Sequence, residues 1–182
     1  MLKALIHNRL DAMERDLHYD LSYVREVLDA DLGAFLRFMR AAKLSSYRRD
    51  LPLDVWHAAK LAGAMSEDCG PCSQLMVTMA ERDNISAETL RAVAQGDDAA
   101  LSSDARLAVQ FVRASLSRDL RADSLREQVV ARWGRCGLLT LAFAMVSARV
   151  YPTLKYALGH GRACTRLTIA GEPLAVKHPA AA

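Results

Sequence analysis

Residues 66–76 read SEDCGPCSQLM and carry two cysteines, Cys69 and Cys72, that lie one helical turn apart. Between them stands Gly70-Pro71. Proline is common in the first turn of a helix, because its fixed φ suits a helix and its missing N–H would have no intrahelical acceptor there. The stretch therefore predicts a helix that begins between the two cysteines and continues to about Arg82.

A helix start at Pro71 would place Cys72 in the first turn and Cys69 at or just before the cap. The unpaired N–H groups and the dipole of a helix start favour a thiolate, which is the reactive form of cysteine. A thiolate attacks a peroxide to give a sulfenic acid, and a neighbouring thiol then condenses with it to form a disulfide. We therefore interpret Cys69 and Cys72 as a redox pair.

The segments on both sides of the pair read as helices. Residues 54–65 are rich in Ala and Leu, and Pro52 suits the first turn of that helix. Ser86 is a good N-cap for the next helix downstream, which should stop near Gly96. Apolar spacing and cap residues predict later helices at about 103–116, 123–133 and, after Gly134, 136–158 with a kink at Pro152.

The two ends of the chain differ from this pattern. Apolar residues at helical spacing in 2–17 and again in 21–39 predict a helical hairpin before the core. Residues 165–169 alternate like a strand, and residues 171–182, with two prolines and a run of alanines, predict a mobile tail. We expect one all-α domain over 1–182, with an N-terminal helical extension (1–51), a core (52–162) and the tail (171–182).

Composition narrows the class of protein. The chain has 182 residues, 52% of them hydrophobic and 25% charged, as in an ordinary globular domain. A net charge of +3 with scattered basic residues argues against a nucleic-acid partner. The start lacks the pattern of a signal peptide, and the longest apolar run, Cys136 to Ala148, is shorter than the about 20 residues that span a bilayer. We therefore expect a cytoplasmic protein without a membrane partner, in which that run is a buried core helix and a close cysteine pair is catalytic or metal-binding.

Residues 57–76, HAAKLAGAMSEDCGPCSQLM, resemble the core of the alkylhydroperoxidase D-like and carboxymuconolactone decarboxylase superfamily. The likeness extends over about 52–161. It implies a compact helical core that assembles into a homo-oligomer, with Cys72 attacked by peroxide and Cys69 resolving the disulfide. The implied partners are a small peroxide or disulfide substrate and a thiol reductant that the sequence does not identify; no cofactor is implied.

The chain departs from the family at the proton relay. Peroxidase members carry a glutamate in the preceding helix and a histidine one turn after the second cysteine, and these positions hold His57 and Met76 here. Methionine cannot take a proton, whereas histidine titrates near ~6.5. The resemblance therefore suggests His57 as a third catalytic residue that replaces the relay; a core or surface histidine with a satisfied structural hydrogen bond is the alternative.

Two other functions fit the same residues. Cys69, Cys72, His160 and Cys164 have the types and spacing that a tetrahedral zinc site accepts, although a long helical segment separates the two halves. A non-catalytic or decarboxylase-like member of the superfamily is the second alternative, because a fold does not determine a function.

Overall fold

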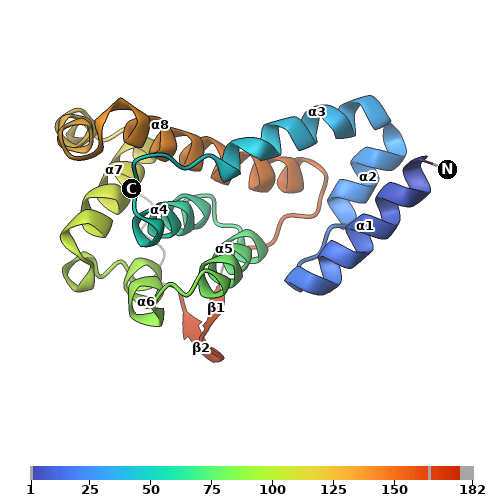
Figure 1. The fold of residues 1–182 in the computed structure, drawn as a ribbon. Coiled ribbons are helices and arrows are strands. Elements are labelled where there is room, and N and C mark those ends of the chain that lie inside the picture. Colours follow the sequence, from blue (N-terminus) through green and yellow to red (C-terminus); the bar gives the residue numbers. More distant parts are fainter. Residues whose placement is uncertain (1, 164, 177–182) are drawn as a thin grey trace.

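The computed structural model describes residues 2–163 and 165–176. Over these residues the chain is all-α, as the sequence predicts, with eight α-helices, two short 3₁₀ turns and one two-stranded sheet (Figure 1). The elements are α1 Leu2–Leu17, α2 Ser22–Ala30, α3 Leu32–Ala42, η1 Lys43–Ser46, α4 Leu53–Met65, α5 Gly70–Arg82, α6 Ala87–Gln95, η2 Asp98–Ala100, α7 Ser103–Ser117, α8 Arg121–Ala157, β1 Arg166–Ile169 and β2 Glu172–Ala175.

Helix α4 is the centre of the core. It packs against α5, α6, α7 and α8, and every residue from Val55 to Ala64 is buried. At Gly63 an added Cβ would lie only 2.9 Å from the Cβ of Ala148, so glycine allows the close approach of α4 to α8. The predicted cap is confirmed as well, because the Ser86 hydroxyl accepts the N–H of Thr89 at the start of α6.

The N-terminal extension contains three helices instead of the predicted hairpin. Asp31 interrupts the second apolar stripe, since its side chain accepts the N–H of Ala34 and caps α3. These helices lie to one side of the core (Figure 1) and have a hydrophobic cluster of their own. The buried residues of this cluster are Leu10, Tyr19, Leu21, Tyr23, Val24, Leu28 and Phe35. Leu75 of α5 and Tyr151 of α8 pack against it, so the extension is docked on the core.

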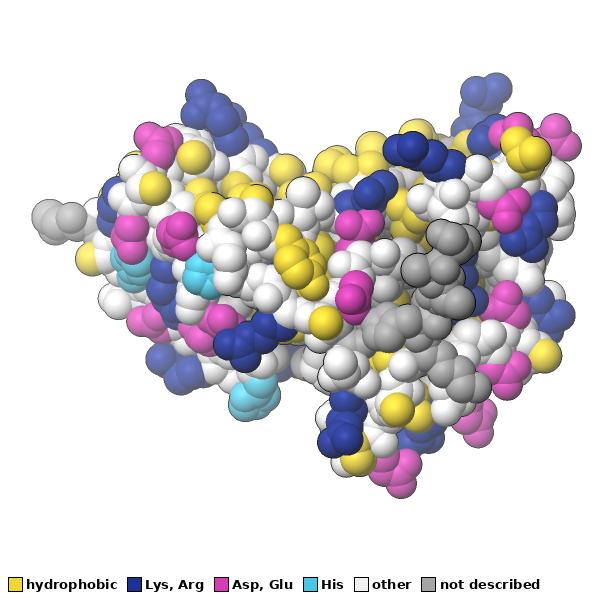
Figure 2. Space-filling view, turned by 180° about the vertical axis from the view of Figure 1, so that it is seen from behind, with side chains coloured by type: hydrophobic (Ala, Val, Ile, Leu, Met, Phe, Trp, Pro, Cys, Tyr) yellow, Lys and Arg dark blue, Asp and Glu magenta, His cyan; other side chains and the backbone are white. Residues whose placement is uncertain are grey.

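Helix α8 is interrupted at Gly134, as the sequence predicts, where φ is 67° and ψ is −173°; Pro152 lies inside the helix. The apolar run that follows is only partly a core helix: Leu141 and Ala144 are buried, whereas Leu139 and Val146 are 46% and 48% exposed. Hydrophobic side chains gather along the upper edge of the molecule in Figure 2, on the side where α8 runs. By length and composition alone α8 could cross a membrane, and 28% of its most apolar stretch is buried within the chain.

The residues after α8 are more ordered than the sequence suggests. The strand expected at 165–169 is confirmed as β1, and it pairs antiparallel with β2, with Leu167 opposite Leu174. Part of the predicted mobile tail, 172–175, is therefore a strand, because Leu167 and Ile169 anchor the hairpin in the core. Residues 177–182 of that tail lie outside the described part of the chain.

Candidate active site

The cysteine pair lies at the start of α5, as predicted. The helix begins at Gly70 with Pro71 in its first turn, and Cys69 is the N-cap residue. Cys69 and Cys72 are joined by a disulfide, with their Cα atoms 5.3 Å apart. The spacing of the motif and the helix start therefore place the two sulfurs at bonding distance.

The loop before α5 is held by the last turn of α8 and by the chain that follows it. The N–H of Gly70 donates to the carbonyl of Arg162 at 3.0 Å, and the Tyr156 hydroxyl donates to the carbonyl of Asp68 at 2.9 Å. Asp68 itself has a φ of 49°, a conformation that aspartate tolerates better than most residues. The position of the pair thus depends on contacts with residues almost ninety positions away.

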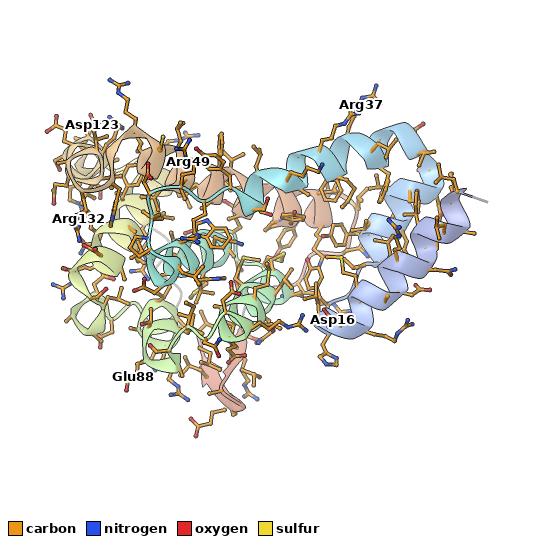
Figure 3. All side chains as sticks on the ribbon, viewed as in Figure 1. Asp16, Arg37, Arg49, Glu88, Asp123 and Arg132 are labelled. Carbon is orange, nitrogen blue, oxygen red and sulfur yellow. A yellow bond between two sulfur atoms is a disulfide. The ribbon has the colours of Figure 1, made fainter. Side chains whose placement is uncertain are left out.

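The pair is covered by the N-terminal extension. Cys69 is fully buried and Cys72 is 5% exposed. The hydroxyl of Tyr19, between α1 and α2, lies 3.7 Å from the Cys72 sulfur. Asp16, labelled in Figure 3 near the end of α1, pairs with Arg82 at the end of α5 at 2.7 Å. The extension therefore contacts both ends of α5 and completes the surroundings of the Cys72 sulfur.

A cavity of about 190 Å³ lies between the extension and the core, and Cys72 forms part of its wall. Most of the other lining side chains are apolar; they include Leu10, Met13, Leu75, Met76 and Met79. The hydroxyl-bearing residues on its wall are Tyr19, Tyr23, Tyr151, Ser45 and Ser147. An apolar molecule with a small reactive group fits such a space, since few polar groups compete for it.

Lys155 of α8 contacts Tyr19 and Tyr23, two of the tyrosines that line this cavity. Its Nζ lies 4.3 Å from the ring centre of Tyr19 and 4.9 Å from that of Tyr23, which are cation–π distances. Burial lowers the pKa of Lys155 and raises the pKa of Tyr19 to about 12. The Tyr19 hydroxyl is therefore neutral at physiological pH and can donate a hydrogen bond to a thiolate.

His57 does not lie at the cysteine pair. Its Nε2 is 2.7 Å from a carboxylate oxygen of Asp83, the residue that follows the last turn of α5. Eleven residues of helix separate Asp83 from Cys72, or about 16 Å. Burial lowers the pKa of His57, and the Asp83 carboxylate offsets part of that effect. Helices α4 and α5 do pack antiparallel, and this arrangement takes His57 to the end of α5 away from the sulfurs.

Lys60, one turn after His57, is a residue of the cavity wall that the sequence analysis overlooked. It is 2% exposed, and its Nζ lies 4.1 Å from the ring centre of Trp56. Burial lowers its pKa to about 8, and the more distant Asp83 has a smaller opposite effect. A lysine in the middle of an Ala-rich, otherwise apolar helix was the pattern that could have identified it.

The zinc interpretation finds no support in the described residues. They contain no group of three or more His, Cys, Asp or Glu side chains that could hold a metal ion. His160 instead pairs with Glu26 of α2 at 2.7 Å. Cys164, the fourth ligand in that interpretation, lies outside the described residues.

Comparisons of the chain with protein-family models, with curated proteins and with solved structures find no match. The likeness to the alkylhydroperoxidase D-like superfamily thus remains one of motif residues. The geometry around Cys72 is the basis for a proposal of function.

Proposed function

We propose that the protein is an alkylhydroperoxidase D-like thiol peroxidase that reduces an apolar organic hydroperoxide at Cys72, with Cys69 as the resolving cysteine. One observation carries the proposal: Cys72 is bonded to Cys69 and at the same time lines an apolar cavity. A sulfur that is open to such a cavity can meet a small apolar peroxide while bulk water is excluded.

The chemistry balances with these two residues and an external dithiol. The Cys72 thiolate attacks the outer peroxide oxygen, the O–O bond breaks, and Cys72 becomes a sulfenic acid while the alkoxide leaves and takes up a proton. The Cys69 thiol then attacks the sulfenic sulfur, which forms the Cys69–Cys72 disulfide and releases water. A dithiol reductant returns both cysteines to thiols by thiol–disulfide exchange and is itself oxidised to a disulfide.

The burial of the pair favours a small peroxide over a protein disulfide as the substrate. Direct exchange with a protein disulfide needs a sulfur that a second macromolecule can approach in line. Cys72 is 5% exposed beneath Tyr19, and Cys69 is fully buried. A small apolar hydroperoxide reaches Cys72 through the cavity instead.

The resemblance also supports the proposal that the chain forms a homo-oligomer. The exposed face of α8, with Leu139 and Val146, is the surface that we assign to this contact. Large side chains of this kind are normally covered when they cluster on a helix.

The experiment is a titration of the reduced chain with cumene hydroperoxide and, separately, with hydrogen peroxide. We expect loss of two thiols per chain, a Cys69–Cys72 disulfide in the peptide masses, and faster reaction with the organic peroxide because the cavity is apolar. Cys69→Ser should stop at a Cys72 sulfenic acid, which dimedone traps, and Cys72→Ser should not react. Persistence of both thiols under excess peroxide would show that the chain is not a peroxidase.

A further inference from the structure

The cavity beside Cys72 carries a single formal charge. Among the described residues of its wall, Lys60 is the only ionised side chain, and no aspartate or glutamate lines the space. The tyrosines there are neutral, because burial raises the pKa values of Tyr19, Tyr23 and Tyr151. Lys155, which contacts the Tyr19 and Tyr23 rings, adds a second positive charge nearby, which Asp20 offsets in part. The surroundings therefore favour an anion over a cation or a neutral molecule.

The Lys60 amine has no oxygen partner of its own. Within residues 2–163 and 165–176, its Nζ makes no hydrogen bond or ion pair with a carboxylate or carbonyl oxygen; it lies 4.1 Å from the ring centre of Trp56. With a pKa of about 8 the amine is still mostly protonated at neutral pH. Buried charges in proteins are normally paired, because an unpaired one is costly to desolvate. The four-carbon stem is flexible, so the ammonium can turn to a ligand without movement of α4.

Lys60 and Cys72 lie at different levels of the cavity. His57, one turn before Lys60, is bonded to Asp83 at the far end of α5, whereas Cys72 lies in the first turn. Asp83 and Cys72 lie about 16 Å apart along α5. Because α4 runs antiparallel to α5, the backbone of Lys60 is one turn, or about 5 Å, nearer to Cys72 than that of His57. The backbones of Lys60 and Cys72 are therefore separated by on the order of 10 Å along the two helices, and the amine lies further back, against the ring of Trp56 one turn earlier. This separation is too large for direct proton transfer.

We propose that this cavity binds an apolar monocarboxylate, with the carboxylate paired to Lys60 and the other end of the molecule at Cys72. The site is a ligand site in its own right. Together with the proposed function, on which this second part rests, the site also defines the substrate class: hydroperoxides of medium-chain acids that carry the peroxide at least about 10 Å from the carboxylate.

Calorimetric titration with octanoate, 1-octanol and octylammonium tests the ligand site in the absence of any peroxide. We expect octanoate to bind at least about tenfold more tightly than octanol, as a charge-assisted hydrogen bond provides, and octylammonium to bind most weakly. Lys60→Met should reduce the affinity for octanoate to that for octanol and leave octanol unchanged. Lys43→Met, which removes the same charge from an exposed site in η1, should change neither.

Equal affinities for octanoate and octanol in the wild-type chain would overturn the proposal, as would octanoate binding that Lys60→Met leaves intact. If Lys60→Met does not fold, the affinities of the wild-type chain for octanoate and octanol decide the question alone. Reduction of ω-hydroperoxyoctanoate and of octyl hydroperoxide separates the two proposals. Lys60-dependent octanoate binding without reduction of either peroxide would refute the peroxidase function alone. Reduction of both at equal catalytic efficiency, with no preference for octanoate, would refute the carboxylate site alone.

Discussion

The hydroxyl of Tyr19 lies 3.7 Å from the sulfur of Cys72, a residue 53 positions further along the chain. Tyr19 belongs to the extension and Cys72 to the core, so the site is formed by two parts of the molecule with separate hydrophobic clusters. The extension is therefore part of the candidate site and not only an addition to the core.

Tyr19→Phe tests this contact. The substitution removes the hydroxyl that can donate to the Cys72 thiolate and keeps the ring that Lys155 contacts. We expect the single-turnover rate of sulfenic acid formation at pH 7 to fall about tenfold, in line with the loss of a hydrogen bond to a charged group. Tyr151→Phe is the matched control, because Tyr151 lines the same cavity and makes no hydrogen bond to Cys72. Equal rates in the wild type and Tyr19→Phe would assign Tyr19 a packing role alone.

His57→Ala separates catalysis from stability. Since His57 is bonded to Asp83 at the far end of α5, we expect the peroxide rate of Cys72 to stay within about twofold. The free energy of unfolding should fall by about 2–4 kcal/mol, because a buried ring and its hydrogen bond are lost. Urea unfolding and single-turnover kinetics on the same samples provide both numbers. A large loss of rate with unchanged stability would restore His57 to the catalytic role that the resemblance suggests.

Because of Lys60, the free energy of unfolding should vary with pH in the alkaline range. Its pKa is about 8 in the folded chain against an ordinary value of 10.5, so between these values the unfolded chain binds a proton that the folded chain does not. Stability therefore rises with pH across that window. The unfolding free energy of the wild type relative to Lys60→Met should increase by about 3 kcal/mol from pH 8 to pH 10.5. A difference that does not change with pH would mean that the folded state does not disfavour the charged amine.

Val146→Glu tests the exposed face of α8. If this face is a contact between copies, the wild type should run as an oligomer in light scattering and Val146→Glu as a monomer, since burial of a carboxylate in an apolar contact is costly. Gln128→Glu, an exposed change of similar kind before Gly134, should keep the oligomer. A monomeric wild type that sediments with lipid vesicles would instead indicate that α8 faces a membrane.

Structural features that depend on residues within one helical turn could be predicted from the sequence. Pro71 and Ser86 act within one turn of helix, so the start of α5 and the cap of α6 were readable. Asp31 was equally local, but the apolar spacing continues through it and concealed the break between α2 and α3. Tyr19 could not be identified, because its place beside Cys72 results from packing between distant segments and leaves no pattern near either residue.

The position of His57, the candidate proton relay, shows the same limit of prediction from sequence spacing. The resemblance places the relay residue at His57 by its distance in sequence from the cysteine pair. The distance in sequence determines the position of His57 along α4, but it does not determine which residue packs against the His57 side chain. In the structure that residue is Asp83. Lys60, one turn later, is the charged residue of α4 that reaches the cavity wall.

The cover over Cys72 has a kinetic consequence. Because the extension has its own hydrophobic cluster, it can lift from the core in a local opening that costs less free energy than global unfolding. A bulky reductant would reach the disulfide only in that open state. We expect its reduction rate to level off as its concentration rises, at a plateau equal to the opening rate, which amide hydrogen exchange of α2 measures independently. The rate at which the disulfide is reduced would then be limited by the opening of the first 51 residues and not by the reductant.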